Sequence, residues 1–487
     1  MKAKHIVVIG GGITGLTAAY ELHKRFASIG QAIQITLLEK SNKLGGAIQT
    51  LKRDGFVIEK GPDSFLARKP VVLNLSKELG LVNDLTGLSP TASKSSIYMN
   101  GKLHPMPAGL AMGIPTQIKP FVGTSLLSLS GKARASLDFL LPRKDKPGDE
   151  SLGSLIERRL GKEVADRLVG PILAGIYAGD LNLLSTAATF PQLLDMEEKH
   201  RSLILGMLSS RSKQQTKTPN SVGVELPPHL RSSMFLTYKG GLCTLVDHLN
   251  EELRRAGTLI SLNSLVETIS LQQEGYEIRL ASGAQLTTDG IILSAPAEQA
   301  SHVLQGASQR IFGALRQIPS VSVANVVMAF DQAQFKKPLQ GSGFVVPRHE
   351  GLLITACTWT SVKWNHTAPK GKVLIRAYLG RWGDQTHLQL NDFELKQRVI
   401  KDLVRILGER VSPLFTEITR HTEAMSQYLV GHMERLRDIE EELHTLYPNL
   451  IIAGRSYRGV GIPDCIAQGK DAAERLFQQL HVESYTN

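Results

Sequence analysis

The N-terminal part of the chain alternates between apolar runs and a glycine-rich turn. Residues 5–9 are apolar and rich in β-branched side chains, which predicts a buried parallel strand. The glycine-rich turn at 10–15 follows directly, and residues 16–22 have the small and apolar side chains of a helix. A second apolar run at 33–38 ends at Glu39. This order of strand, glycine turn, helix, strand and acid predicts a βαβ unit that binds a dinucleotide.

Each residue type in this unit has a physical reason. Gly10 permits a tight turn, Gly12 lets the backbone approach a pyrophosphate, and Gly15 allows close packing of helix on strand. The phosphates are then expected at the helix N-terminus, where free N–H groups and the helix dipole favour anions. Glu39 lies 24 residues after Gly15, a suitable spacing for a carboxylate that binds ribose hydroxyls.

Further glycine segments indicate which dinucleotide is bound. A glycine pair within residues 44–50 suits a loop that folds back over a large cofactor. Near the C-terminus, an apolar strand at 450–454 is followed by a glycine turn at 457–464 and a helix at about 465–480. Such a turn can direct backbone N–H groups toward a ring system, so these segments favour FAD over NAD.

A third strand, turn and helix lies in the middle of the chain, at 234–238 and 242–253. The cofactor domain is therefore expected to combine the start, middle and end of the chain, with a second domain between them. Outside it, Ser151 is the expected N-cap of a helix, and residues 209–228 are an expected exposed loop. The apolar face of that helix would contain Leu152, Leu155, Ile156 and Leu160. Residues 321–329 and 373–379 are expected strands.

Composition and charge narrow the functional class. The 487 residues are 42% hydrophobic and 21% charged, as in a folded protein of two or three domains of about 150 residues each. Three widely spaced cysteines indicate free thiols in a reducing compartment. No apolar run reaches the roughly 18 residues of a membrane-spanning helix, and no basic run or aromatic motif indicates nucleic acid. The net charge of +11 fits a small substrate with several carboxylates, although solubility alone would also explain it.

The electron acceptor is inferred from what the sequence lacks. It has no second glycine motif for NAD(P)H and no paired cysteines, and its 14 histidines show no metal-ligand spacing. A flavin reduced by its substrate would then give its electrons to oxygen or to an acceptor that the sequence does not reveal. The sequence therefore favours an oxidase without a metal.

Four longer motifs carry a resemblance to a known family, and the second and third of them are the most particular. They lie at 60–66 (KGPDSFL), 175–180 (GIYAGD), 354–360 (ITACTWT) and 459–466 (GVGIPDCI). With them, the chain resembles the FAD-dependent porphyrinogen oxidases from end to end. The resemblance implies an α/β fold in which a Rossmann-type FAD-binding domain, like that of p-hydroxybenzoate hydroxylase, is joined to an α+β substrate domain and a helical insertion.

The implied domains are interleaved along the chain. The expected FAD-binding segments are 1–63, 232–297 and 445–487. The expected substrate-domain segments are 64–100 and 298–444. The helical insertion, which resembles the membrane-binding part of attached relatives, is expected at 101–231.

The resemblance also implies a reaction, the oxidation of coproporphyrinogen III to coproporphyrin III with oxygen as acceptor and peroxide as by-product, in haem biosynthesis. Protoporphyrinogen IX is the alternative substrate. A flavin amine oxidase and a non-catalytic carrier of flavin or porphyrin are further alternatives. The protein is expected in the cytoplasm, at most peripheral to the membrane, with transient contact to a ferrochelatase.

Site residues are implied position by position. Lys69 is expected to bind a substrate propionate, and Tyr378 and Tyr177 to face the macrocycle, although ordinary surface and core positions would also explain them. No catalytic acid or base is expected, because placing the substrate at the flavin is sufficient. The expected FAD contacts are Gly10, Gly11, Gly12, Ile13, Thr14, Gly15, Glu39, Lys40, Gly46, Ala47, Gly61, Pro62, Asp63, Ser64, Val266, Gly454, Val460, Gly461 and Ile462.

Two positions depart from the pattern of the family. Ala47 stands where relatives have a basic residue that contacts the cofactor, and His421 stands where close relatives have a tryptophan near the flavin. Both departures predict altered FAD affinity or redox potential in an unchanged fold. Arg376 and Arg455 could meet carboxylates, but pairing at helix ends or on the surface is the preferred interpretation of both.

Overall fold

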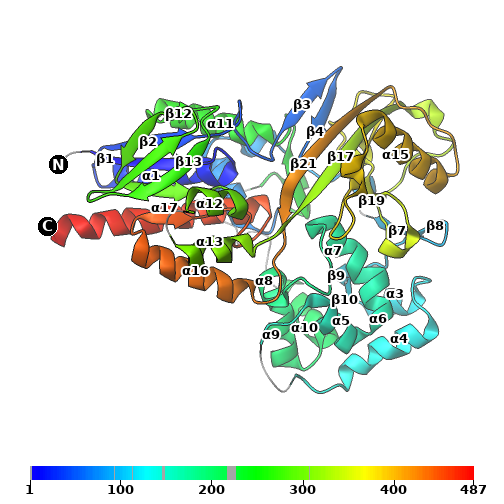
Figure 1. Ribbon diagram of the computed structural model, residues 1–487. Coiled ribbons are helices and arrows are strands. Elements are labelled where there is room, and N and C mark those ends of the chain that lie inside the picture. The colour runs from blue at the N-terminus through cyan, green and yellow to red at the C-terminus, as the bar shows by residue number, and fades with distance from the viewer. Residues whose placement is uncertain are drawn as a thin grey trace.

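The computed structural model describes residues 3–92, 94–111, 113–144, 148–215, 226–305 and 308–486. A parallel sheet with its helices lies beside a larger sheet, and a group of helices lies below the larger sheet (Figure 1). This arrangement agrees with the α/β fold expected from the sequence.

The parallel sheet is assembled from distant parts of the chain. Its strands, in spatial order, are β12 (Leu259–Ser261), β2 (Ile33–Leu38), β1 (Lys4–Ile9), β16 (Gly290–Leu293) and β22 (Leu450–Ile452). Every neighbouring pair among them is parallel. Alternate residues of β1 belong to two different hydrophobic cores, one on each face of the sheet. Burial on both faces explains why these strands are continuous apolar runs in the sequence.

Helices cover both faces of this sheet. One face is covered by α1 (Ile13–Ser28), α11 (Cys243–Arg255) and α17 (Ile462–Thr486). The first and the last helix lie side by side (Figure 1), so residues from both ends of the chain meet at one site. The other face is covered by β13 (Val266–Leu271), β14 (Tyr276–Leu280), β15 (Gln285–Thr288), α12 (Ala297–Val303), α13 (Gln309–Arg316) and α16 (His432–Leu446).

The larger sheet has seven strands and a hydrophobic core of its own. In spatial order they are β21 (Phe415–Ser426), β17 (Ser320–Asp331), β20 (Lys372–Leu379), β19 (Ile354–Thr358), β18 (Gly343–Val345), β7 (Ser95–Met99) and β8 (Lys102–Pro105). Helix α15 (Asp392–Leu407) packs its apolar face on this sheet. A capping box of Asn391 and Glu394 begins the helix, and Gly408, with φ of +71°, ends it.

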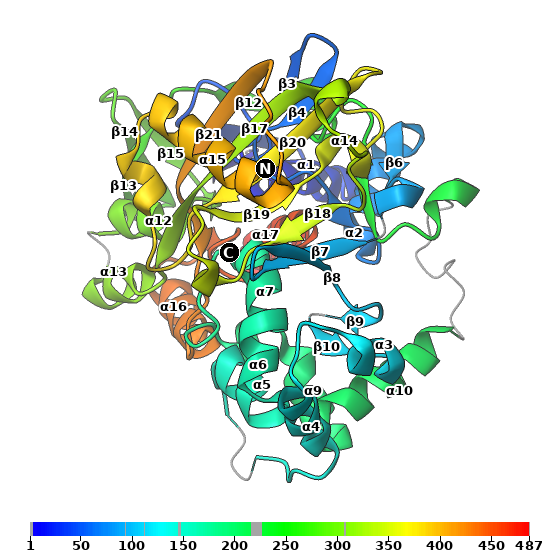
Figure 2. The same cartoon turned by 90° about the vertical axis from the view of Figure 1, so that its right-hand side faces the viewer.

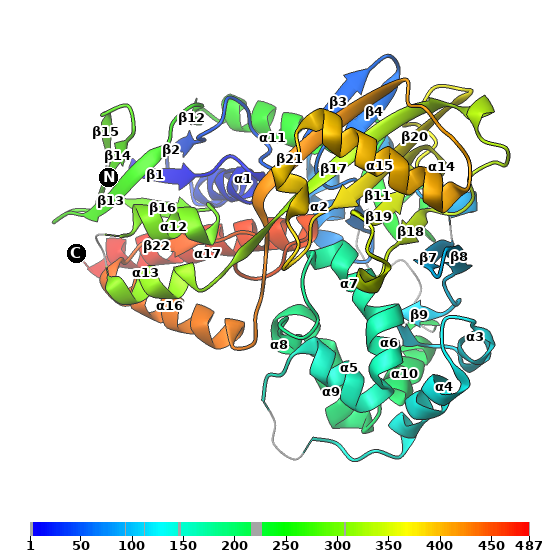
Figure 3. The ribbon, with the colours of Figure 1, turned by 45° about the vertical axis from the view of Figure 1, so that its right-hand side comes forward.

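The helical insertion lies below the larger sheet (Figure 2). Its helices are α3 (Ile118–Gly123), α4 (Leu129–Ser136), α5 (Leu152–Leu160), α6 (Lys162–Val164), α7 (Gly170–Tyr177), α8 (Thr186–Thr189), α9 (Pro191–His200) and α10 (Leu203–Gln215). The side chain of Ser151 caps α5 as predicted, and the four predicted apolar residues of α5 are buried. Helix α7 extends from the insertion to β18 and β19 (Figure 3).

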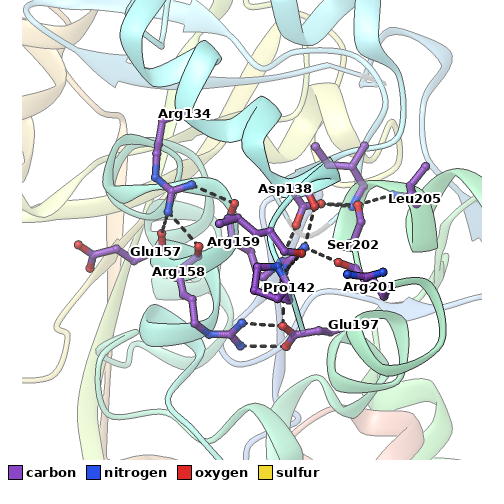
Figure 4. A network of polar contacts seen from close by, with 12 residues as sticks. Arg134, Asp138, Pro142, Glu157, Arg158, Arg159, Glu197, Arg201, Ser202 and Leu205 are labelled. Carbon is purple, nitrogen blue, oxygen red and sulfur yellow. Dashed lines mark hydrogen bonds and ion pairs between the residues drawn. The ribbon is translucent and has the colours of Figure 1, made fainter. Parts of the chain in front are cut away.

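A buried polar network joins the helices of the insertion (Figure 4). Arg159 and Asp138, both fully buried, form an ion pair at 2.6 Å. The other oxygen of Asp138 accepts hydrogen bonds from the hydroxyl of Ser202 and the backbone N–H of Ile204.

Within the described residues, no helix is both long and apolar enough to cross a membrane.

The remaining elements are short strands and helices outside these groups, apart from β9 and β10, which lie within the helical insertion (Figure 2). They are β3 (Thr50–Arg53), β4 (Phe56–Glu59), β5 (Phe65–Leu66), α2 (Pro70–Glu78), β6 (Leu85–Gly87), β9 (Leu110–Ala111), β10 (Ile114–Pro115), β11 (Phe235–Tyr238) and α14 (Thr360–Lys363).

Two expectations about elements need correction. Strand β11, predicted within a cofactor-domain unit, does not join the parallel sheet but pairs antiparallel with β5 and β6. The loop predicted at 209–228 is wrong at its start, because α10 continues to Gln215. Residues 216–225 of that loop lie outside the described residues.

Candidate functional site

Gly10, Gly12 and Gly15 of the turn after β1 have different surroundings. Gly10 has φ of +105°, and a Cβ added there would lie 2.7 Å from the Ser294 hydroxyl. A Cβ on Gly15 would lie 2.0 Å from the carbonyl oxygen of Gly10. A Cβ on Gly12 would meet no atom within 4 Å among the described residues. Gly10 and Gly15 are therefore required by packing, whereas Gly12 borders open space.

This open space lies at the N-terminus of α1. Gly12 is the N-cap of α1, and within the described chain no acidic residue occupies the first turn, which contains Ile13, Thr14 and Gly15. Gly46, with φ of +57°, approaches so closely that an added Cβ would lie 3.3 Å from the Gly12 Cα. Free N–H groups, the helix dipole and two bare glycine backbones form a cradle that fits a pyrophosphate.

Glu39 is held in a single orientation beside the cradle. Its buried carboxylate accepts hydrogen bonds from the N–H of Gly11 at 2.7 Å and of Ser41 at 2.8 Å. Its backbone carbonyl accepts from the N–H of Ser264, which leads into β13 and the buried Val266. The carboxylate keeps lone pairs for ribose hydroxyls, and the side chain of the neighbouring Lys40 is exposed.

The segment 60–64 lies against the second glycine pair. A Cβ on Gly61 would come within 1.7 Å of the Ala47 carbonyl oxygen. The carbonyl of Gly61 accepts from Arg376, and the Asp63 carboxylate accepts from Lys363 at 2.9 Å and from the hydroxyl of Ser64. Although burial acts to raise it, the charges of Lys363 and Arg376 hold the pKa of Asp63 well below its usual range. The Asp63 side chain is therefore part of an ion pair that fixes this segment, which also contains Pro62.

The C-terminal glycine turn is fixed by a tyrosine and a histidine that the sequence analysis missed. The hydroxyl of the fully buried Tyr428 donates to the Arg455 carbonyl at 2.6 Å and accepts from the N–H of Gly459 at 2.8 Å. His432 stacks on the Tyr428 ring and lies 2.7 Å from the Tyr457 carbonyl. These bonds hold the turn that contains Gly454, Val460, Gly461 and Ile462. The position of Tyr428 directly after a long strand was the only sequence signal for it.

The structure brings two of the three expected substrate residues to this turn. The ammonium of Lys69 pairs with the carboxylate of Asp464, which lies in the first turn of α17. Tyr177 packs against Val460 and Tyr428. Burial, together with the charge of Asp464, raises the pKa of Tyr177 to about 12.

Tyr378, the third expected substrate residue, lies on β20 of the larger sheet. Its ring stacks under the Arg376 guanidinium, 4.8 Å away, and its hydroxyl lies 3.4 Å from the Thr358 hydroxyl. The segment that follows β20 contacts the residue after Tyr177, since the N–H of Trp382 donates to the Ala178 carbonyl at 2.7 Å.

His421 contacts the segment 60–64. Its Nε2 lies 2.7 Å from the carbonyl oxygen of Lys60, which can only accept, so Nε2 carries a proton. Burial lowers the pKa of His421, and the positive charges of Arg376, Arg455 and Lys60 lower it further. The imidazole is therefore neutral at pH 7 and lies beside the segment expected to contact the flavin.

The interpretation of the two arginines as helix-end or surface ion pairs is wrong. Arg376 is only 5% exposed, and its Nε and Nη1 have no hydrogen-bond partner among the described residues. No hydrogen bond or ion pair of the Arg455 guanidinium is found within the described ranges either. Both positions depend on tertiary packing that local sequence does not reveal.

Comparison with known proteins agrees with this geometry. The family described as flavin containing amine oxidoreductase matches residues 13–477. Coproporphyrinogen III oxidase of Bacillus subtilis is 43% identical, covering 96% of this chain and 97% of the relative. The Staphylococcus aureus enzyme of that name is 38% identical, covering 98% and 100%.

A solved structure from Exiguobacterium sp. 255-15, provisionally named protoporphyrinogen oxidase, has a TM-score of 0.85 at 35% identity. The similarity covers 99% of this chain and 100% of that one. The fold, the FAD cofactor and the family predicted from the sequence are thereby confirmed. The chain belongs to the flavin-containing amine oxidoreductases and, within them, to the FAD-dependent porphyrinogen oxidases.

Proposed function

We propose that this protein oxidises coproporphyrinogen III to coproporphyrin III in haem biosynthesis. The observation that carries the proposal is the 43% identity, along nearly the whole chain, to a relative named for this reaction. A cationic side chain, Lys69, next to the glycine turn at the start of α17 is consistent with a substrate that has four propionates.

The reaction removes six hydrogens from the macrocycle in three two-electron steps. Three molecules of oxygen are reduced to three of hydrogen peroxide, which balances the hydrogens and electrons. Bound FAD supplies the two-electron acceptor. The protein itself binds and orients the substrate and excludes water, so no acid–base pair is assigned.

The proposed FAD site contains the glycine turns, Glu39 and the segment at 60–64. The full set is Gly10, Gly11, Gly12, Ile13, Thr14, Gly15, Glu39, Lys40, Gly46, Ala47, Gly61, Pro62, Asp63, Ser64, Val266, Gly454, Val460, Gly461 and Ile462. The cradle at Gly12 and the fixed carboxylate of Glu39 support it. The interleaved domain boundaries are proposed likewise, supported by the distant origins of the strands of the parallel sheet.

The proposed substrate site contains Lys69, Tyr177 and Tyr378. Because Lys69 is 38% exposed and paired with Asp464, an incoming propionate can bind Lys69 alongside the Asp464 carboxylate or in its place. Replacing Lys69 by methionine is expected to raise the KM for coproporphyrinogen while leaving FAD affinity unchanged. K77M, at an exposed lysine of the same helix α2, is the matched control. An unchanged KM in K69M would remove Lys69 from the site.

The decisive experiment compares two substrates on the FAD-loaded protein in air. Porphyrin fluorescence, oxygen uptake and peroxide are followed with coproporphyrinogen III and with protoporphyrinogen IX. A higher kcat/KM for coproporphyrinogen, with three peroxides per porphyrin, is the expected result. Preference for protoporphyrinogen would replace the proposed function by that of its nearest rival.

The remaining proposals concern the surroundings of the enzyme. Oxygen is the physiological acceptor, and the protein works in the cytoplasm with at most peripheral contact to a membrane. Its product passes in a transient contact to a ferrochelatase. Cell fractionation and co-purification test these points separately from the substrate comparison.

A further inference from the structure

Arg455 lies at the end of the parallel sheet where the cofactor cradle opens. It is the first residue after Gly454, in the turn between β22 and α17. A Cβ on Gly454 would point to the Thr14 hydroxyl at 3.8 Å, and Thr14 belongs to the first turn of α1. Crevices beyond the carboxyl ends of parallel strands are where dinucleotides bind.

The Arg455 guanidinium is partly buried without a counter-charge. Within the described residues it has no hydrogen bond or ion pair, and its charge acts on Cys465, Tyr428 and His421, none of them a carboxylate. Burial lowers the pKa of Arg455. In the same turn, by contrast, the exposed Arg458 pairs with Glu440. A cation removed from water without a partner is costly, so an anion is expected beside Arg455.

The nearby carboxylates are already engaged. Asp464 pairs with Lys69, Asp63 pairs with Lys363, and Glu39 accepts from two backbone N–H groups. Arg376 differs from Arg455, because its charge acts on the carboxyl groups of Glu59 and Asp63. Among the described residues, Arg455 is therefore left without a carboxylate partner.

The first turn of α1 connects this charge to the cradle. Cys465, which lies within reach of the charge of Arg455, also contacts the hydroxyl of Thr14 in that turn. On the other side of the cradle, the Gly46 backbone lies against Gly12, and the next residue, Ala47, carries no charge.

We propose that Arg455 binds the pyrophosphate of FAD. The inference concerns the cofactor alone and stands whichever porphyrinogen is the substrate.

The test is a titration of apoprotein with oxidised FAD, followed by flavin fluorescence. R455Q is expected to raise the Kd by about 10- to 100-fold, the effect of losing a charge-assisted hydrogen bond. R458Q, which removes a charge from the same turn, is the control and should leave the Kd within about twofold. Competition by ADP, which retains the diphosphate, should weaken in R455Q, whereas competition by AMP should not.

Two further measurements exclude a folding defect and a different ligand atom. Because R455Q removes an uncompensated cation, the R455Q apoprotein should melt at the same or a higher temperature than the wild type. Adding A47K to R455Q should restore much of the lost affinity. An unchanged Kd in R455Q would overturn the proposal. A shifted midpoint potential with unchanged affinity for oxidised FAD would overturn it in favour of pairing with the reduced ring.

Discussion

The buried ion pair in the helical insertion allows a quantitative test of what holds this part together. Asp138 and Arg159 are both fully buried, and the Asp138 carboxylate is the partner of the Arg159 Nε (Figure 4). Replacing Asp138 by asparagine keeps the shape of the side chain and removes its charge. Among the described residues, Arg159 then keeps Glu197, 3.6 Å away, as its counter-charge.

Removing one partner of a buried pair costs about 3–5 kcal/mol. Glu197 still attracts the Arg159 guanidinium, so the expected loss in the free energy of unfolding is about 3 kcal/mol. The new amide group adds to this cost, since one of its two ends must face either the Arg159 guanidinium or the N–H of Ile204 in the wrong orientation.

Urea unfolding measures the loss. Far-ultraviolet circular dichroism reports all the helices, including those of the insertion, whereas the fluorescence of Trp359, Trp364 and Trp382 reports the segments that follow strands of the larger sheet. D138N should lower the free energy of unfolding seen by circular dichroism by about 3 kcal/mol. E157Q, at an exposed carboxylate on α5, should change it by less than about 0.5 kcal/mol. A loss below about 1 kcal/mol in D138N would refute the reasoning from buried charge.

Three other perturbations test separate features. Burial raises the pKa of Glu59 from 4.5 to about 7. The stability that Glu59 contributes, about 3 kcal/mol, is therefore present below pH 4.5 and is lost as the pH rises through 7. E59Q should flatten the pH dependence of the unfolding free energy between these pH values, and an unchanged slope would contradict this. G12A should lower FAD affinity without lowering the apoprotein melting temperature, whereas G15A should lower that temperature because its Cβ overlaps the Gly10 carbonyl; equal melting of the two variants would contradict the packing argument. S151A removes the cap of α5 and should lower the free energy of urea unfolding by about 1 kcal/mol. An unchanged free energy of unfolding would show that water replaces the hydroxyl.

The parts predicted well from the sequence are those with strong local signals. Strand β2 and the turn after β1 carry β-branched runs and glycines whose backbone requirements are independent of distant residues. Strand β11 was predicted, but its partners β5 and β6 were not, because these strands are two and three residues long and carry no periodicity. Helix α10 extends past Ser209 because arginine, lysine and glutamine favour helices when no glycine or proline intervenes.

The residues of the site also fall into two groups, those that local spacing predicts and those whose contacts only the fold reveals. The glycines and Glu39 follow from the spacing of residues within one βαβ unit. The pairing of Lys69 with Asp464 joins positions 395 residues apart, and no local pattern contains it. The unpaired state of Arg455 depends on the absence of nearby acids in three dimensions, which only the fold establishes.

The assembly of the parallel sheet from both ends of the chain also has a consequence for biosynthesis. Strand β1 ends at Ile9, whereas β22, which completes the sheet, begins 441 residues later, at Leu450. At roughly 5–20 residues per second, roughly 20–90 s separate the two on the ribosome. Once β16 has been made, its outer edge stays open until β22 pairs with it, and in that time it can pair with other chains. The proposed FAD crevice is consequently incomplete until β22 and the turn after it have been made, and a chain cut short before β22 has most of its helices but no complete crevice.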